Sequence, residues 1–231
     1  MATPSWFSAE AYLTNKLATL PSSYGITTLP QLMVAFEKAG FAGADGAYKH
    51  FQMFGDAEGI SPNAYFNATQ YMQAKAVAAL GSASDYNVGL VASAFANLGM
   101  SAWDHYQKYN ATEDINPSNA FSEDVYLAAK AALAGSTATA VKAAITGAGM
   151  TVLQHYMQFA GQTGEVSLST NVAVPADKQV GGTTGRSFTL TTGIDNVVGT
   201  SGNDTFIGGN GAMNTYGPAD QLDGGAGVDT V

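Results

Sequence analysis

The stretch FSAEAYLTNKLA (residues 7–18) decides how this chain folds, because it returns twice. Its copies are FNATQYMQAKAV at 66–77 and FSEDVYLAAKAA at 121–132. Each has Phe first, Tyr five positions later and Lys four positions after that. Such self-similarity is typical of architectures in which one supersecondary unit is used several times.

A second shared segment closes each copy. These segments are AGFAGADGAYKHFQMFGDAEGISPN (39–63), LGMSAWDHYQKYNATEDINPSN (98–119) and AGMTVLQHYMQFAGQTGEVS (148–167). Each holds one histidine at the same place, and together these are all the histidines of the chain: His50, His105 and His155. We therefore predict three copies of one unit, at about 6–63, 64–119 and 120–168.

Each copy is expected to be helical. The residue after each Phe suits the N-cap position, because its side-chain oxygen can accept an unpaired amide of the first turn. These residues are Ser8, Asn67 and Ser122. Ala-rich runs such as LAAKAALA favour helix, and shorter helices are expected at 28–39, 87–98 and 138–148. The last helix of each copy has an aromatic stripe, which is expected to face the core.

The composition limits the partners of the protein. Its 231 residues carry a net charge of −9, which disfavours nucleic acid and favours cations. There is no cysteine for a disulfide or a thiolate metal site. No stretch is long and apolar enough for a membrane-spanning helix. The first residues lack a secretory signal, so we expect either a cytoplasmic protein or an export signal elsewhere.

The last part of the chain has a different composition. After an expected linker at 169–186, residues 187–231 contain five Asp and no Glu, Lys or Arg. Asp195, Asp204, Asp220 and Asp229 are spaced by 9, 16 and 9 residues. The gap of 16 residues equals one nine-residue period plus an insertion of seven residues. The segment NTYGPAD (214–220) is the loop expected to hold this insertion.

Apolar residues follow each of these Asp at strand-like positions, so the spacing predicts a parallel β-roll in which short strands alternate with Gly-rich turns. Carboxylate and carbonyl oxygens at the turns are the ligands that calcium prefers. The candidate calcium-binding residues are Asp195, Gly202, Asp204, Asp220, Asp223, Gly225, Gly227 and Asp229. A plain Gly-rich loop is the alternative interpretation. The expected fold class is α+β: an all-α domain over 1–168, followed by the start of a calcium-binding β-roll over 187–231.

The segment GGAGVDTV (224–231) resembles the G-G-x-G-x-D-x-U-x nonapeptide of RTX proteins, in which U is apolar. GTSGNDTFI (199–207) departs from it by Thr200 in place of the second Gly. The sequence stops within a repeat, so more of the roll or other β structure is expected to follow. The region from 187 onward, together with the helical copies, is similar to Gram-negative surface-layer proteins exported by type I secretion.

This resemblance implies an extracellular structural protein on the exterior of the outer membrane. Its helical domain would bind lipopolysaccharide or another cell-surface glycan, its roll would fold with calcium after export, and the protein would associate with itself into a lattice. Two alternatives remain: a recognition module of an RTX adhesin or toxin, and a fragment of a secreted hydrolase. No catalytic motif is present, so we do not expect an enzyme.

Four residues are candidates for glycan contact: Lys16, Lys75, Lys130 and Trp103. The lysines recur at one place in the copies and could hold phosphates or acidic sugars. Alternatively, each lysine lays its stem over the preceding Tyr and keeps its ammonium in water, and Trp103 belongs to the core. The histidines could bind a metal, or each could play a structural role in its own copy, its ring nitrogen satisfying a loop carbonyl at the helix end.

Overall fold

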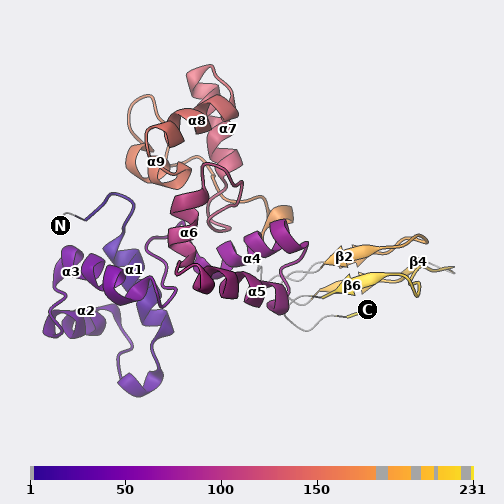
Figure 1. Ribbon diagram of the computed structural model, residues 1–231, viewed down its shortest axis with the longest axis horizontal. Helices are drawn as coiled ribbons and strands as arrows, with labels where there is room; N and C mark the ends of the chain where they lie inside the picture. The colour runs from indigo at the N-terminus through magenta and orange to yellow at the C-terminus, as the bar shows by residue number, and fades with distance from the viewer. Residues whose placement is uncertain (1–2, 181–186, 199–203, 211–212, 225–229) are drawn as a thin grey trace. The chain divides into compact units, whose positions relative to one another are not determined.

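The computed structural model describes residues 3–180, 187–198, 204–210, 213–224 and 230–231. Helices make up most of their regular secondary structure (Figure 1). The α-helices described are α1 (Ala9–Thr19), α2 (Leu29–Lys38), α3 (Gly43–His50), α4 (Ala68–Leu80), α5 (Asp85–Asn97), α6 (Ala102–Tyr109), α7 (Glu123–Ala134), α8 (Ala138–Gly147) and α9 (Val152–Phe159). Short helical turns are η1 (Ser22–Tyr24), η2 (Phe51–Gly55), which continues α3, and η3 (Ala176–Lys178).

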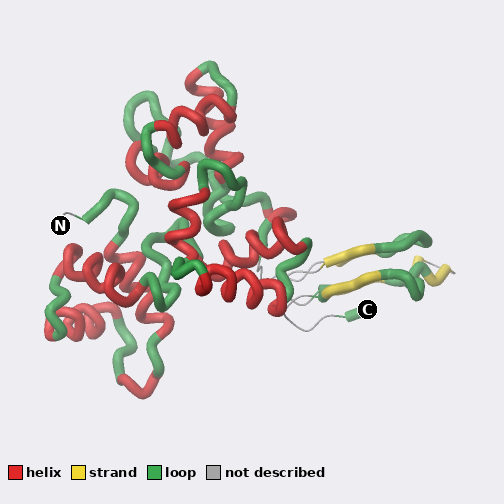
Figure 2. The backbone as a smooth tube through the Cα atoms, viewed as in Figure 1, coloured by secondary structure: helices red, strands yellow, loops and turns green. Residues whose placement is uncertain are grey.

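Strands follow only after these helices, as Figure 2 shows. They are β1 (Ser187–Thr189), β2 (Asn196–Val198), β3 (Thr205–Ile207), β4 (Gly209–Asn210), β5 (Met213–Asn214) and β6 (Gln221–Asp223). The described residues therefore agree with the predicted α+β class and its helical N-terminal part. Two compact units are present: Met1–Tyr71 with Gly99–Val174, and Met72–Leu98 with Pro175–Val231.

The helices begin where the sequence predicts. The Ser8 hydroxyl accepts the amide of Ala11 at the start of α1, and Ser122 does the same for Val125 at the start of α7. The Asn67 side chain accepts the amide of Gln70. The short helices α2, α5 and α8 lie within two residues of their predicted ranges. A glycine with positive φ follows each of them, at Gly40, Gly99 and Gly149, where only glycine adopts the left-handed conformation without strain.

The end of each copy hydrogen-bonds to its own beginning. The amides of the N-cap residues donate to carbonyls at the far end of the copy: Ser8 to Pro62 at 3.1 Å, Asn67 to Pro117 at 3.1 Å and Ser122 to Val172 at 2.6 Å. The third closing carbonyl lies beyond residue 168, within the range expected to be linker. The third copy lacks the proline that ends the others, so its chain returns to its start later, through the buried Val172 and Val174.

Aromatic rings fill the core of the first unit. In each copy the leading Phe packs on the Tyr five positions later, with ring centroids 5.4 to 5.8 Å apart. The residue before the Phe joins one copy to the next: Trp6 lies 4.8 Å from Trp103, and Tyr65 lies 5.1 Å from Tyr156, edge to face. Such pairs stabilise beyond the area they bury, so these rings hold neighbouring copies together.

The C-terminal strands form two parallel pairs. Ser187 of β1 pairs with Thr205 of β3, so these strands are displaced by two nine-residue periods. Asn196 of β2 pairs with Gln221 of β6, a displacement of two periods and the seven extra residues. Thr205 also pairs in parallel with Thr230, at the same displacement as β2 and β6. The described strands lie in separate two-stranded sheets, so they do not show the start of a β-roll that the sequence predicts.

The seven extra residues form a hairpin. Strands β4 and β5 pair antiparallel, and the amide of Thr215 donates to the carbonyl of Gly208 at 2.8 Å. A Cβ on Gly208 would lie 2.9 Å from the Cβ of Tyr216, so glycine allows the two ends of the hairpin to approach. The excursion therefore lies mostly before the expected loop at 214–220.

None of the helices in the described ranges combines the length and the apolar character needed to cross a membrane.

Candidate functional site

A tyrosine–histidine hydrogen bond recurs in every copy. The pairs join the Tyr hydroxyl to the histidine Nδ1: Tyr12 with His50 at 2.7 Å, Tyr71 with His105 at 2.9 Å and Tyr126 with His155 at 2.7 Å. Burial raises the pKa of the Tyr126 hydroxyl and lowers the pKa of His155. In the third copy the bond therefore joins a neutral hydroxyl to a neutral imidazole, and it occupies Nδ1. Each histidine is thus held within its own copy.

The recurring lysines have partners. Lys16 Nζ lies 2.6 Å from Glu58 Oε2, and Lys130 Nζ lies 2.5 Å from Glu165 Oε1. Both lysine side chains are mostly buried, with 15 and 17% of their surface exposed. Lys75 also has an interaction partner. The ammonium groups of Lys16 and Lys130 are therefore compensated inside the protein instead of lying in water over a tyrosine.

Trp103, the aromatic candidate for sugar stacking, lies in the core. Its side chain is 2% exposed, and its ring packs on Trp6 and on Phe66. A sugar has no access to a ring face in this arrangement. Within the described ranges, no three His, Asp or Glu side chains come together in a group that could hold a metal ion.

Glu123 forms a buried polar cluster between the second and third copies. Its Oε1 accepts hydrogen bonds from the Tyr106 hydroxyl at 2.9 Å and from the Asn110 side-chain amide. Its Oε2 lies 3.3 Å from Lys142 Nζ, which also pairs with Asp114 at 2.9 Å. Burial raises the pKa of Glu123 to about 7, although Lys142 and Tyr106 act to lower it. Desolvation of the carboxylate therefore outweighs its attraction to Lys142.

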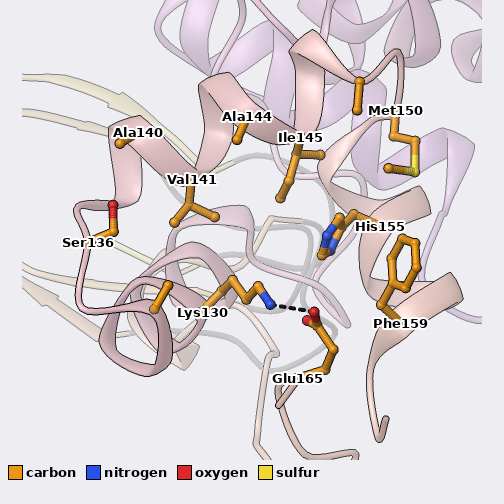
Figure 3. A pocket seen from close by; sticks show the side chains of 12 residues that line it. Lys130, Ser136, Ala140, Val141, Ala144, Ile145, Met150, His155, Phe159 and Glu165 are labelled. Carbon is orange, nitrogen blue, oxygen red and sulfur yellow. Dashed lines mark ion pairs between the residues drawn. The ribbon is translucent and has the colours of Figure 1, made fainter. Parts of the chain in front are cut away.

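A hollow of about 590 Å³ opens within the third copy. Figure 3 shows Val141, Ala144 and Ile145 of α8 on one side and the Lys130–Glu165 ion pair on the other, with His155 and Phe159 at one end. The wall contributed by α8 is apolar, whereas the opposite wall carries charged groups that compensate each other. Such a mixture of an apolar surface and a few polar groups is typical of small-ligand sites.

The Gly-Asp turns bring two of the predicted calcium ligands together. Asp195 and Asp220 stand directly before β2 and β6, which pair in parallel. The amide of Asp195 donates to Asp220 Oδ1 at 2.9 Å, and the amide of Gln221 donates to the Asp195 carbonyl at 2.8 Å. Asp204 is buried at the start of the other strand pair, where its carbonyl accepts the amide of Thr230.

The remaining candidates are described in part or not at all. Asp223 ends β6. Gly202, Gly225, Gly227 and Asp229 lie outside the described residues.

The carboxylates of Asp195 and Asp220 are both held by hydrogen bonds from the chain. Asp195 accepts the amide and hydroxyl of Thr191, and Asp220 accepts the amides of Asp195 and Gly217. These backbone hydrogen bonds lower the pKa of Asp220. A carboxylate oxygen that accepts one hydrogen bond keeps a second lone pair, and residues 187–231 contain no Lys or Arg to neutralise the charge. The negative charge of these two carboxylates is therefore not neutralised by a cationic side chain of this segment.

Sequence reasoning missed three glutamates that the structure places at these sites: Glu58, Glu165 and Glu123. The first two follow the histidine of their copy by 8 and 10 residues, a recurrence that could have predicted the ion pairs.

Compared with protein-family models, with curated proteins and with solved structures, the chain shows no match.

Proposed function

We propose that this protein is a calcium-dependent structural component of a bacterial surface layer, in which the helical copies attach to a cell-surface glycan and residues 187–231 wind around calcium outside the cell. The function is binding and assembly instead of catalysis. The observation that carries the proposal is the register of the C-terminal strands, because it links strand pairing to the spacing of the Asp residues.

That register has a simple physical meaning. In a coil with two strands per winding, each strand and the loop after it take nine residues. Each strand then pairs with the strand two nine-residue periods later. β1 and β3 have this displacement. β2 and β6 are displaced further because the hairpin adds seven residues between them. Both displacements therefore support a parallel β-roll whose turns stack Asp195 over Asp220.

Calcium would be held by the carboxylates of Asp195 and Asp220 on one edge of such a roll. Asp204 would serve the opposite edge together with turn carbonyls. The ion supplies the positive charge that these turns lack, so the roll should fold poorly without it. Calcium is abundant outside cells, and this dependence would keep the segment unfolded until after export by type I secretion.

Attachment to lipopolysaccharide is the second part of the proposal. The net charge of −9 and the internal pairing of Lys16 and Lys130 argue against contact through phosphates. Contact through uncharged sugar residues is favoured instead. Self-association into a lattice would then place many weak glycan contacts side by side and strengthen attachment through multivalency.

The principal alternative is a recognition module of an RTX adhesin or toxin, which shares the calcium-dependent segment. The two differ in what the helical copies bind. Cosedimentation of the full chain with lipopolysaccharide from the source bacterium, with and without calcium, tests the proposal. Retention with lipopolysaccharide supports attachment to the bacterium's own surface, whereas retention only with host-cell glycans would favour the adhesin.

A further inference from the structure

The third copy has a hollow where the first copy has aromatic side chains. The two copies can be aligned by their backbone hydrogen bonds: the amide of Phe41 donates to the carbonyl of Phe36, and the amide of Met150 donates to that of Ile145. A positive-φ glycine precedes Phe41 and Met150 alike. Ile145 and Met150 therefore stand at the positions of two phenylalanines.

These substitutions change the surroundings of the histidine. In the first copy the His50 ring has Phe36 at 4.5 Å, Phe41 at 5.0 Å and Phe54 at 5.2 Å between ring centroids. In the third copy, among the described rings, His155 has Phe159 at 4.7 Å and Tyr126 at 6.1 Å. Where two phenyl rings pack on the histidine in the first copy, Ile145 and Met150 stand in the third copy and line the hollow beside His155.

Polar atoms line the other side of this space (Figure 3). Glu165 Oε1 pairs with Lys130, but Glu165 Oε2 is buried and has no hydrogen-bond partner in the described part of the chain. A buried carboxylate oxygen without a donor is costly. His155 Nδ1 is taken by the Tyr126 hydroxyl, which leaves Nε2 as its available nitrogen.

We infer that this hollow binds an uncharged sugar residue in which a methyl group replaces a hydroxymethyl group or an acylamino group replaces a hydroxyl. A ligand hydroxyl or amide would donate to Glu165 Oε2, a ligand hydroxyl, which can donate or accept, would hydrogen-bond with His155 Nε2, and the apolar substituent would pack on Ala144 and Ile145. A charged ligand is disfavoured because Lys130 and Glu165 already neutralise each other. This inference rests on the proposed glycan attachment and names its ligand class and its site.

Matched glycosides test the inference directly. The full chain is titrated with methyl α-L-rhamnoside and methyl α-L-mannoside, which differ by one hydroxyl, and with methyl N-acetylglucosaminide and methyl glucoside. Side-chain NMR signals of His155 and Phe159 report binding. We expect one substituted sugar to shift them with an affinity about tenfold above that of its hydroxylated counterpart. Absence of shifts, or equal shifts within both pairs, overturns the inference.

Two variants assign the binding to the hollow. Ile145→Phe with Met150→Phe gives the third copy the residues that the first copy accommodates, so the variant should fold and lose binding about tenfold. Phe36→Ile with Phe41→Met in the first copy is the matched control, and this variant should bind the sugar as wild type does. Glu165→Gln leaves the shape and removes the anionic acceptor, and should also weaken binding. Unchanged binding in both third-copy variants overturns the inference.

The same variants separate this inference from the proposed function. If wild type binds lipopolysaccharide and the filled variant binds it equally, the hollow is not the site, although attachment stands. If wild type does not bind lipopolysaccharide but the glycoside shifts are seen, attachment fails and the sugar site stands.

Discussion

Replacing Glu123 with Gln should alter how the stability of the helical copies depends on pH. Glu123 is 2% exposed, and burial raises its pKa from 4.5 to about 7. Folding therefore favours its protonated form. Gln has the same shape and can accept the hydrogen bonds from Tyr106 and Asn110, but it does not titrate.

The direction and size of this pH effect follow from the pKa of Glu123 in the unfolded and in the folded protein. A carboxyl whose pKa is raised by folding contributes stability that is complete below pH 4.5 and is lost as the pH rises through 7. Each pKa unit corresponds to about 1.4 kcal/mol, so Glu123 should lower the free energy of unfolding by about 2.5 kcal/mol between pH 5 and pH 8.

Urea denaturation at pH 5 and pH 8 measures this change in wild type and in Glu123→Gln. Histidines titrate in both proteins, so their contributions cancel in the comparison. Between pH 5 and pH 8, the free energy of unfolding of the variant should rise by about 2.5 kcal/mol relative to that of wild type. Glu10→Gln, in the exposed first turn of α1, is the matched control. Parallel pH profiles for wild type and Glu123→Gln would refute the reasoning.

Four further substitutions have defined outcomes. Tyr126→Phe removes the hydroxyl that binds the histidine of its copy and should lower the free energy of unfolding by about 1 kcal/mol in chemical denaturation; no loss would mean that this bond is not stabilising. Gly55→Ala places a methyl group against the Tyr12 hydroxyl and should cost about 1 to 3 kcal/mol, whereas Gly89→Ala in open space within α5 should stabilise by about 0.5 to 1 kcal/mol. Equal melting temperatures for these two variants would contradict the packing. Asp220→Asn should weaken calcium binding about tenfold in isothermal titration, and an unchanged affinity would remove this residue from the proposed site.

The helical copies were predictable because local signals act at short range. The caps at Ser8 and Ser122 were confirmed. The partners of the recurring side chains were harder to predict. Glu58 and Glu165 lie far from their lysines in sequence, and only the folded copy brings them together. Glu123 has no equivalent in the other copies, so no periodicity points to it.

In the C-terminal segment the spacing of the Asp residues was informative, whereas local composition misplaced the loop. The spacing of Asp195, Asp204 and Asp220 predicted where strands would follow, and β2, β3 and β6 begin one residue after these three. The position of the seven-residue excursion was wrong by several residues, because loop composition at 214–220 suited it as well as the Gly-rich run before it. Packing of Gly208 against Tyr216 decided the hairpin, and composition does not report such a contact.

Hydrogen exchange of the full chain with and without calcium tests the central claim most directly. The amides of Leu190, Phe206 and Gln221 donate across the strand pairs. The account predicts that millimolar calcium slows exchange of these three amides while amides of the helical copies exchange as before. Equal exchange of the three amides with calcium and with chelator would contradict a calcium-wound segment and the surface-layer proposal that depends on it.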